Sequence, residues 1–202
     1  MSARPLEGLR VLEFSHTVMG PTAGLLFAEL GADVIKVEPA PDGDRTRRLG
    51  GFGAGFFAGF NRNKRSLAID LKSKEGQAVM HRLVPTADIV LENFGPGTME
   101  RLGCGWEHLA PLNDRLIYLA LKGYLAGPYE HRPALDEVVQ FQSGLAWMTG
   151  PPGRPLRAGP PSSTSWARCL VSSPCRPPCG NATPPARASA WRVPCSKAPS
   201  SS

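Results

Sequence analysis

The segment that decides the fold begins Leu9-Arg10-Val11-Leu12-Glu13-Phe14, passes Gly20-Pro21 and Thr22-Ala23-Gly24-Leu25-Leu26-Phe27-Ala28-Glu29-Leu30-Gly31, and ends Asp33-Val34-Ile35-Lys36-Val37-Glu38. Its first and last parts are short apolar runs with β-branched residues, a pattern typical of strands. Between them, apolar residues at helical spacing predict a helix over 22–30 that Gly31 ends. A strand, a helix and a second strand within about thirty residues predict a right-handed βαβ unit of a parallel sheet.

The same alternation continues toward residue 148. Ser73 is expected to cap a helix that ends before Pro85. Strands are expected at 87–91 and 116–121, a short extended piece at 66–71, and further helices at 98–102 and 136–148. Residues 1–159 are therefore predicted to form an α/β domain built on a Rossmann-like parallel sheet.

Residues 160–202 have a different composition. They contain nine Pro and ten Ser but no Phe, Asp or Glu, and no apolar periodicity of either kind. Such a segment buries too little apolar surface to offset the entropy of ordering it, so a disordered tail is predicted. Cys169, Cys175, Cys179 and Cys195 lie in this tail. Their spacings do not match the two closely spaced ligand pairs of structural zinc sites, so we predict no metal site.

The charge of the chain is unevenly distributed. Five of its 23 Lys and Arg residues lie in 160–202, which leaves 18 basic against 17 acidic residues in 1–159. The nearly neutral domain predicts no nucleic-acid partner. No stretch approaches the ~20 apolar residues of a membrane span, and the start does not read as a signal peptide. We therefore expect no membrane partner. Cys104 is the domain's lone thiol, so we expect a reducing, cytoplasmic location.

Several motifs in the first 159 residues carry a family resemblance. They are Pro5-Leu6-Glu7-Gly8 before the first strand, Leu30-Gly31-Ala32-Asp33-Val34-Ile35-Lys36-Val37-Glu38, Asn63-Lys64-Arg65-Ser66-Leu67, Glu92-Asn93-Phe94-Gly95-Pro96-Gly97 and Lys122-Gly123-Tyr124. In this order and spacing they resemble the N-terminal part of the family III coenzyme A (CoA) transferases, of the formyl-CoA and carnitine CoA-transferase type. The resemblance implies an acyl-CoA:carboxylate CoA-transferase that works as a homodimer through a covalent Asp intermediate. Its substrates would be an acyl-CoA and a carboxylic acid, with no permanently bound cofactor.

The resemblance also implies CoA-binding positions. It places the pantetheine and thioester beside the loop after the first strand, the adenine against a second segment, and the rest of the nucleotide near two further loops. In that order the residues are His16, Val18 and Met19; Ile69, Asp70, Leu71 and Lys72; Asn93, Phe94, Gly95 and Arg101; and Lys122, Gly123 and Tyr124.

Some of these positions have a simpler interpretation. Val18 and Met19 fit plain packing as well, and Arg101 fits a solvated surface charge. Lys122 follows a strand at the edge where open α/β sheets bind ligands, and a Lys there can act as a point charge toward an anion. The family often has a basic residue where Pro39 stands and, in its formyl type, a polar residue where Val18 stands. Pro39 argues against a contact with the CoA phosphates at that position. Val18 argues against oxalate or formate as substrates.

The nucleophilic Asp of the family is expected near Ser163 and Thr164, but no Asp follows Asp136. The codons of residues 162–170 can be read in a shifted frame that starts at the third base of each codon. Synonymous codon choices then permit the peptide Val-Asp-Ile-Met-Gly-Ala-Met-Phe-Gly, which resembles the family's nucleophile segment. The same shift over 185–200 permits a segment that resembles the family's Gly-Gln-x-Val motif. We therefore expect a single frameshift near Gly159 in the gene of an enzyme roughly twice as long, and no catalytic residue in this chain.

Two alternative functions remain open. An α-methylacyl-CoA racemase has the same fold but requires a His and a carboxylate on opposite sides of the α-carbon. Racemases carry that His where Leu135 stands, and His131 is the only histidine near it. The other alternative is a CoA-binding remnant that carries out no chemistry.

Overall fold

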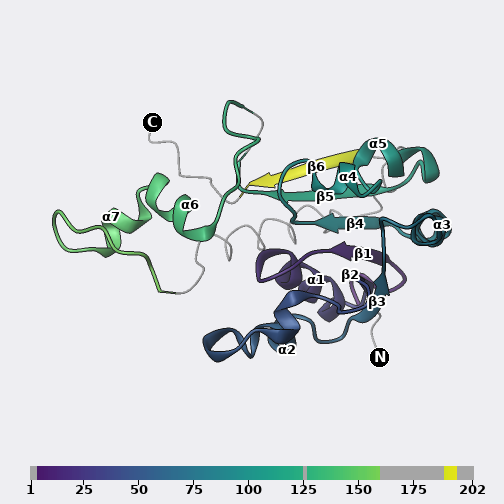
Figure 1. Ribbon diagram of the computed structural model, residues 1–202, viewed down its shortest axis with the longest axis horizontal. Coiled ribbons are helices and arrows are strands. Elements are labelled where there is room, and N and C mark those ends of the chain that lie inside the picture. The colour runs from purple at the N-terminus through teal and green to yellow at the C-terminus, as the bar shows by residue number, and fades with distance from the viewer. Residues whose placement is uncertain (1–3, 125–126, 160–188, 195–202) are drawn as a thin grey trace.

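The computed structural model describes residues 4–124, 127–159 and 189–194. Its centre is a six-stranded parallel sheet with the order β3-β2-β1-β4-β5-β6 (Figure 1). The predicted Rossmann-like α/β fold is confirmed. The strands are β1 (Arg10–Phe14), β2 (Asp33–Pro39), β3 (Arg65–Ile69), β4 (Ile89–Glu92), β5 (Ile117–Lys122) and β6 (Ser189–Pro194).

Helices connect the strands, as the alternating pattern predicts. The hydroxyl of Ser73 accepts a hydrogen bond of 3.0 Å from the backbone N–H of Gly76, which confirms the predicted cap of α3. The α-helices are α1 (Met19–Glu29), α2 (Phe56–Phe60), α3 (Lys74–Leu83), α4 (Thr98–Arg101), α5 (Trp106–Leu109), α6 (Asp136–Gln142) and α7 (Leu145–Thr149); the 3-10 helices are η1 (Arg45–Arg48), η2 (Gly51–Gly53), η3 (Val84–Thr86) and η4 (Ala110–Leu112).

The strand order reverses at β1. The chain builds outward from β1 to β2 and β3, then returns to the other side of β1 for β4 and β5. Phe14, the last residue of β1, lies opposite Glu92, the last residue of β4. The loops that follow these two strands therefore leave the sheet side by side. In open α/β sheets this switch point is where ligands bind.

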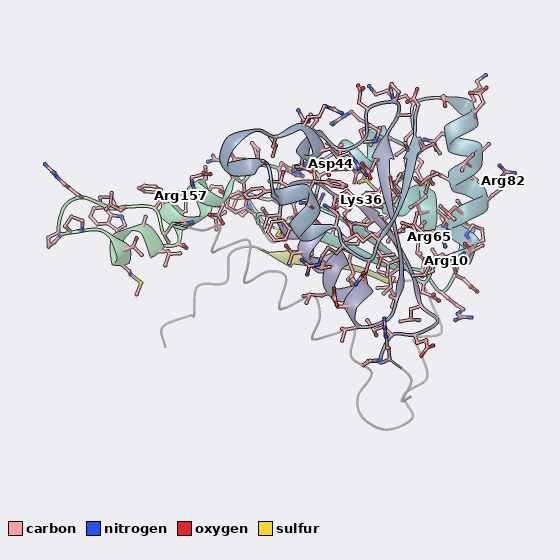
Figure 2. All side chains as sticks on the ribbon, turned by 90° about the horizontal axis from the view of Figure 1, so that it is seen from below. Arg10, Lys36, Asp44, Arg65, Arg82 and Arg157 are labelled. Atoms are coloured by element: carbon pink, nitrogen blue, oxygen red, sulfur yellow. The ribbon has the colours of Figure 1, made fainter. Side chains whose placement is uncertain are left out.

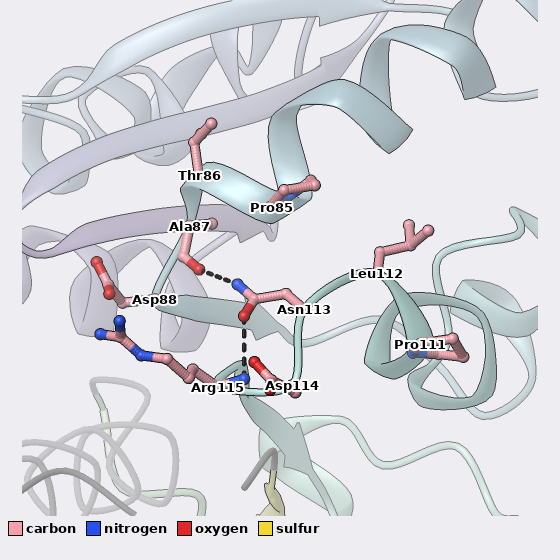
Figure 3. Close-up of a pocket in the computed structure, with 9 residues that line it drawn as sticks. All are labelled: Pro85, Thr86, Ala87, Asp88, Pro111, Leu112, Asn113, Asp114 and Arg115. Carbon is pink, nitrogen blue, oxygen red and sulfur yellow. Dashed lines mark hydrogen bonds between the residues drawn. The ribbon is translucent and has the colours of Figure 1, made fainter. Parts of the chain in front are cut away.

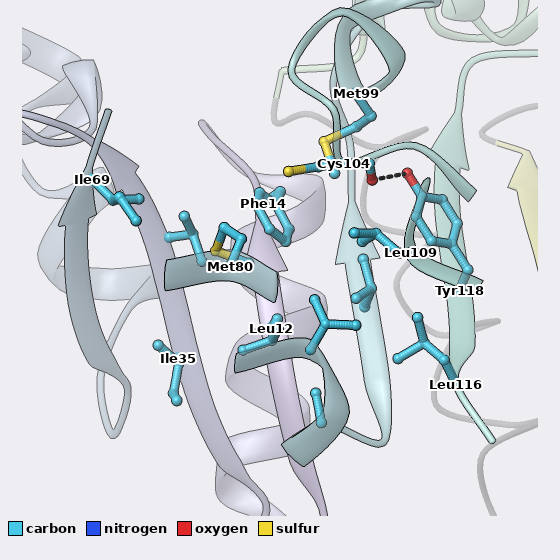
Figure 4. Packing of buried hydrophobic residues seen from close by; sticks show 14 residues of the cluster. Leu12, Phe14, Ile35, Ile69, Met80, Met99, Cys104, Leu109, Leu116 and Tyr118 are labelled. Carbon is cyan, nitrogen blue, oxygen red and sulfur yellow. Dashed lines mark hydrogen bonds between the residues drawn. The ribbon is translucent and has the colours of Figure 1, made fainter. Parts of the chain in front are cut away.

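The hydrophobic core has two layers because side chains alternate across each strand. Val11 faces α1, and Leu12 and Phe14 face the opposite layer (Figure 4). The first layer also includes Met19, Ala23, Phe27, Val34, Ile89, Leu91, Leu119 and Leu121, and the second includes Ile35, Val37, Met80, Val90, Met99, Cys104, Leu109, Leu116 and Tyr118. Burial raises the pKa of the Cys104 thiol to about 11, so this cysteine is a packing residue.

The single helix predicted over 136–148 is wrong, because two helices occupy this region. Gly144 has a φ of +82° and separates α6 from α7. A left-handed residue ends a helix, and glycine adopts this conformation without a Cβ clash. The two helices project beyond the carboxyl edge of the sheet (Figure 1).

Beyond Gly159 the described residues form a strand that the sequence does not predict. No strand pattern is evident there, yet β6 pairs in parallel with β5 from Ile117↔Ser189 to Lys122↔Pro194. Pairing to an open sheet edge uses backbone groups, which every residue except proline supplies in full, so it does not require apolar alternation. The rest of the predicted tail, with its four cysteines, lies outside the described residues. Within the described part of the chain, no helix is long and apolar enough to cross a bilayer.

Gly24 allows α1 to approach the sheet closely, which gives a test of this packing. A Cβ at this position would lie 1.7 Å from Oε2 of the buried Glu13. We expect Gly24→Ala to destabilise the protein by about 1–3 kcal/mol despite the higher helix propensity of alanine. Gly59→Ala in α2 is the matched control, because a Cβ there meets no atom within 4 Å. Urea unfolding measures both variants, and equal stability of the two would contradict the close approach.

Candidate ligand site at the switch point of the sheet

The loops after β1 and β4 are joined by a pair of hydrogen bonds. The backbone N–H of His16 donates to Oδ1 of Asn93 at 3.0 Å, and Nδ2 of Asn93 donates to the carbonyl of His16 at 3.0 Å. The imidazole of His16 stacks on the ring of Phe94, with centroids 5.5 Å apart and planes 24° apart. These three predicted residues therefore form one unit at the switch point.

His16 is half-buried, and its surroundings favour the neutral imidazole. Burial lowers its pKa below the usual 6.5, Arg45 and Lys36 act in the same direction, and Asp44 opposes them. Nδ1 lies 2.8 Å from the hydroxyl of Thr17. At neutral pH this ring is consequently an uncharged hydrogen-bonding group and an aromatic surface.

Four buried charges lie beneath the loop between β1 and α1. Lys36 Nζ is 3.3 Å from Glu13 Oε1 and 3.1 Å from Asp44 Oδ2, and Lys64 Nζ is 2.7 Å from Glu13 Oε2. All four side chains are at most 2% exposed. Figure 2 labels Lys36 and Asp44 inside the domain. We call Glu13, Lys36, Asp44 and Lys64 the buried ion cluster.

The buried ion cluster holds the start of the β1–α1 loop and the first turn of α1. Lys36 Nζ donates to the carbonyl of Ser15 at 2.7 Å, and Lys64 Nζ donates to the carbonyl of Pro21 at 2.7 Å. Burial lowers the pKa of Lys64 to about 8, although Glu13 opposes the shift. The sequence does not predict that these four residues form a cluster. The available signal was that Glu13 and Lys36 are charged residues inside otherwise apolar strands.

A second ion pair fixes the segment after β2. Glu38 accepts hydrogen bonds from Nε and Nη2 of Arg47, each at 2.7 Å, and from the hydroxyl of Ser66 at 2.8 Å. Burial opposes ionisation of Glu38, but these bonds and one from the Asp44 backbone outweigh it and lower its pKa to about 2. The folded-state pKa is below the ordinary 4.5, so this carboxylate stabilises the fold above pH 4.5 and loses that contribution as the pH falls toward 2.

Lys122 contacts the protein itself. Its Nζ lies 2.5 Å from Glu92 Oε1 and donates to the carbonyl of Phe94 at 2.9 Å. Burial raises the pKa of Glu92, and the ammonium of Lys122 opposes that shift. Lys122 therefore supports the Asn93–Phe94 loop from below. Its expected role as a point charge toward a ligand stays a prediction.

The other predicted positions are more widely spread. Val18 and Met19 are 6% and 8% exposed, which agrees with the packing interpretation. Arg101 is exposed and bonds to Thr98 within its own helix. Ile69 ends β3, and Asp70, Leu71 and Lys72 follow it; in the sheet, β2 and β1 lie between β3 and β4. Gly95 is exposed in the loop after β4, and Gly123 and Tyr124 follow β5.

A pocket of about 590 Å³ lies at the opposite, amino-terminal edge of the sheet (Figure 3). Pro85, Asp88, Pro111, Asn113 and Arg115 are among its lining residues. Asn113 is engaged within the protein, because its Nδ2 donates to the carbonyl of Ala87 at 2.7 Å and its Oδ1 accepts from the N–H of Arg115 at 3.0 Å. Ligands of open α/β sheets bind at the carboxyl edge, so we do not assign the function to this pocket.

The described part of the chain contains no group of three or more His, Cys, Asp or Glu side chains arranged to hold a metal ion. The four cysteines considered as a zinc site fall outside the described residues.

The strand order and the loops that meet at its switch point define a doubly wound α/β protein. The family profile described as CoA-transferase family III matches residues 6–167, and the chain belongs to this family.

Two named CoA-transferases are similar over most of the chain. A formyl-CoA:oxalate CoA-transferase of Rhodopseudomonas palustris is 40% identical over 165 residues, covering 80% of this chain and 38% of the relative. A succinate–glutarate CoA-transferase of Agrobacterium fabrum is 42% identical over 167 residues, covering 77% of this chain and 42% of the relative. The chain thus spans about two-fifths of the length of these relatives.

Solved structures agree with this relationship. Rv3272 of Mycobacterium tuberculosis superposes with a TM-score of 0.83 at 34% identity, covering 96% of this chain and 54% of that protein. A CAIB/BAIF family protein of Brucella suis superposes with a TM-score of 0.77 at 35% identity, covering 85% of this chain and 49% of that protein.

The buried ion cluster is expected to contribute strongly to stability. Lys36→Met leaves the carboxylates of Glu13 and Asp44 buried with one cation fewer, so we expect a loss of about 3–5 kcal/mol. Arg65→Met is the control, because Arg65 pairs with Asp33 at 3.2 Å on the surface, where the Arg65 side chain is 66% exposed. Its loss should stay below about 1 kcal/mol. Chemical denaturation that finds similar losses for both variants would contradict the assigned role of the cluster.

Proposed function

We propose that the parent activity of this fold is acyl-CoA:carboxylate CoA transfer, and that the 202-residue chain binds CoA without carrying out the transfer. The observation that carries the proposal is the unit formed by His16, Asn93 and Phe94 at the switch point. This unit presents an aromatic surface and backbone groups where open α/β sheets bind ligands. Family membership supplies the ligand and the reaction class.

The absence of a suitable nucleophile supports the second half of the proposal. The proposed route through a covalent Asp intermediate requires a carboxylate that reaches the thioester carbonyl carbon. Among the described residues at this edge, Glu13, Asp44 and Glu92 are buried in ion pairs with Lys side chains. Farther along, Asp136 accepts from Gln140 at 2.5 Å and Glu137 pairs with Arg157 at 3.2 Å. None of these carboxylates is both unengaged and placed beside His16.

A frameshift near Gly159 explains the missing Asp. The shifted reading over 162–170 permits an Asp across the codons of Ser163 and Thr164, and the same frame over 185–200 permits a segment that resembles the family's Gly-Gln-x-Val motif. The coding DNA tests this directly, because codons that do not yield these two peptides in the shifted frame rule the explanation out.

The racemase alternative receives no support from the residues it needs. Leu135 occupies the position of the expected base and is 69% exposed. His131 is on the surface, where its Nε2 lies 3.2 Å from Glu130, and its side chain is 85% exposed. Proton exchange at the α-carbon of an acyl-CoA, measured in deuterated water beside CoA exchange in an intact homologue, separates the two activities.

The proposal predicts CoA binding that depends on the switch-point unit. We expect the chain to bind CoA in calorimetry but to show no exchange of label between an acyl-CoA and a free carboxylic acid. Asn93→Ala should weaken CoA binding about tenfold, since about 1.4 kcal/mol corresponds to that factor. Asn113→Ala is the control, because it also removes hydrogen bonds of a loop amide but lies at the opposite edge.

Two results would count against the proposal. Acyl transfer by the purified chain would contradict the lack of a nucleophile. Absence of binding heat with CoA, or equal effects of the two Asn variants on affinity, would contradict the location of the site.

A homodimer also belongs to the proposal, and the projecting helices support it. Trp147, Met148 and Leu135 are 61%, 85% and 69% exposed on or next to α6 and α7. Several large exposed apolar side chains close together are typical of a contact surface. We expect sedimentation velocity to show self-association that Trp147→Lys reduces and Leu49→Lys, at a 42% exposed site elsewhere, leaves unchanged. A wild-type chain that stays monomeric at high concentration would contradict this prediction.

A further inference from the structure

Arg45 differs from the other arginines of η1 in having no partner within the described residues. Arg47 forms two hydrogen bonds with Glu38, and Arg48 donates to the carbonyl of Asp42 at 2.5 Å. The side chain of Arg45 is exposed and makes neither a hydrogen bond nor an ion pair with the described part of the chain. Within this short helix, one guanidinium therefore remains available for an external anion.

The buried ion cluster places Arg45 beside the switch point. Arg45 follows Asp44, whose carboxylate is 3.1 Å from Lys36 Nζ. The same Nζ donates to the carbonyl of Ser15 at 2.7 Å, and Ser15 precedes His16. One buried ammonium thus fixes the segments of Arg45 and His16 relative to each other. Arg45 also acts electrostatically on His16, which is consistent with their proximity.

The backbone of η1 is held rigidly enough to position the Arg45 segment. Oδ1 of Asp44 accepts a hydrogen bond of 2.9 Å from the N–H of Thr46, and the N–H of Asp44 donates to Glu38 at 2.7 Å. Asp44 and Thr46 are buried on either side of the exposed Arg45. A fixed backbone reduces the entropy lost when the side chain orders around a ligand.

We propose that Arg45 and His16 form an anion-binding subsite at the carboxyl edges of β1 and β2, which binds a phosphate or carboxylate group of the ligand. A guanidinium offers paired N–H donors that match the oxygens of either group, and the neutral imidazole adds one further donor. The subsite rests on the proposed function for the identity of its ligand. It assigns the anion contact to Arg45, whereas the resemblance places a basic residue at the position of Pro39.

The test compares Arg45→Ala with Arg82→Ala in the full chain. Arg82 is an exposed arginine on α3, away from Asp44 in Figure 2. Calorimetry at fixed ionic strength measures binding of CoA, dephospho-CoA, pantetheine and succinate to both variants and to the wild type. A second measurement follows the imidazole NMR signals of His16 during titration with inorganic pyrophosphate. Both arginines are exposed, so circular dichroism should show unchanged folding.

We expect Arg45→Ala to weaken binding of the anionic ligand about tenfold and to abolish the shift of the His16 signals, while Arg82→Ala changes neither. A loss confined to CoA identifies the 3′-phosphate, a loss shared by CoA and dephospho-CoA but not pantetheine identifies the diphosphate, and a loss confined to succinate identifies a carboxylate. Each of these results supports the subsite.

Equal affinities of Arg45→Ala and wild type for every ligand that binds, or His16 signals that respond alike in both proteins, would overturn the subsite. Failure of the wild type to bind CoA would instead contradict the proposed function. In that case the pyrophosphate titration decides on the subsite alone, because an Arg45-dependent shift of His16 supports it and the absence of such a shift rejects it.

Discussion

Two buried carboxylates and two buried ammonium groups neutralise each other beneath the first turn of α1, and the geometry of the switch point depends on them. Desolvating these charges costs several kcal/mol for each ion, so the cluster persists only because each charge has a close partner. Lys36 and Lys64 use their remaining donors on the carbonyls of Ser15 and Pro21. Charge neutralisation and the conformation of the β1–α1 loop are therefore set by the same side chains.

The sheet topology determines what this loop meets. Because β1 lies between β2 and β4, the loop that the ion cluster fixes leaves the sheet next to Asn93 and Phe94. Lys122 and Glu92 support that second loop in a similar way from the neighbouring strands. Each side of the candidate site thus rests on a Lys–carboxylate pair with a buried carboxylate, at the carboxyl ends of the strands. These charges serve to hold the backbone, which leaves the exposed Arg45 as a cation available to a ligand.

The sequence predicted the fold well because its signals are local. The apolar runs at β1 and β2, the Ser73 cap and the Gly31 end of α1 each depend on a few neighbouring residues. The sequence does not predict the break at Gly144, because the helical pattern continues past this left-handed glycine, and it does not predict β6, because edge pairing does not depend on side-chain pattern. For the site, the sequence and its family resemblance pointed to His16, Asn93 and Phe94. The partners of Lys36 and Lys122 could not be predicted, because they come from segments far apart in the chain and brought together only by the sheet.

Hydrogen–deuterium exchange of the chain with and without CoA tests the central claim most directly. CoA bound at the switch point should slow exchange at 15–19 and 93–97 and leave 85–88 and 111–115, which lie at the opposite edge, unchanged. Slower exchange confined to 85–88 and 111–115, or no change anywhere in the presence of saturating CoA, would contradict the account.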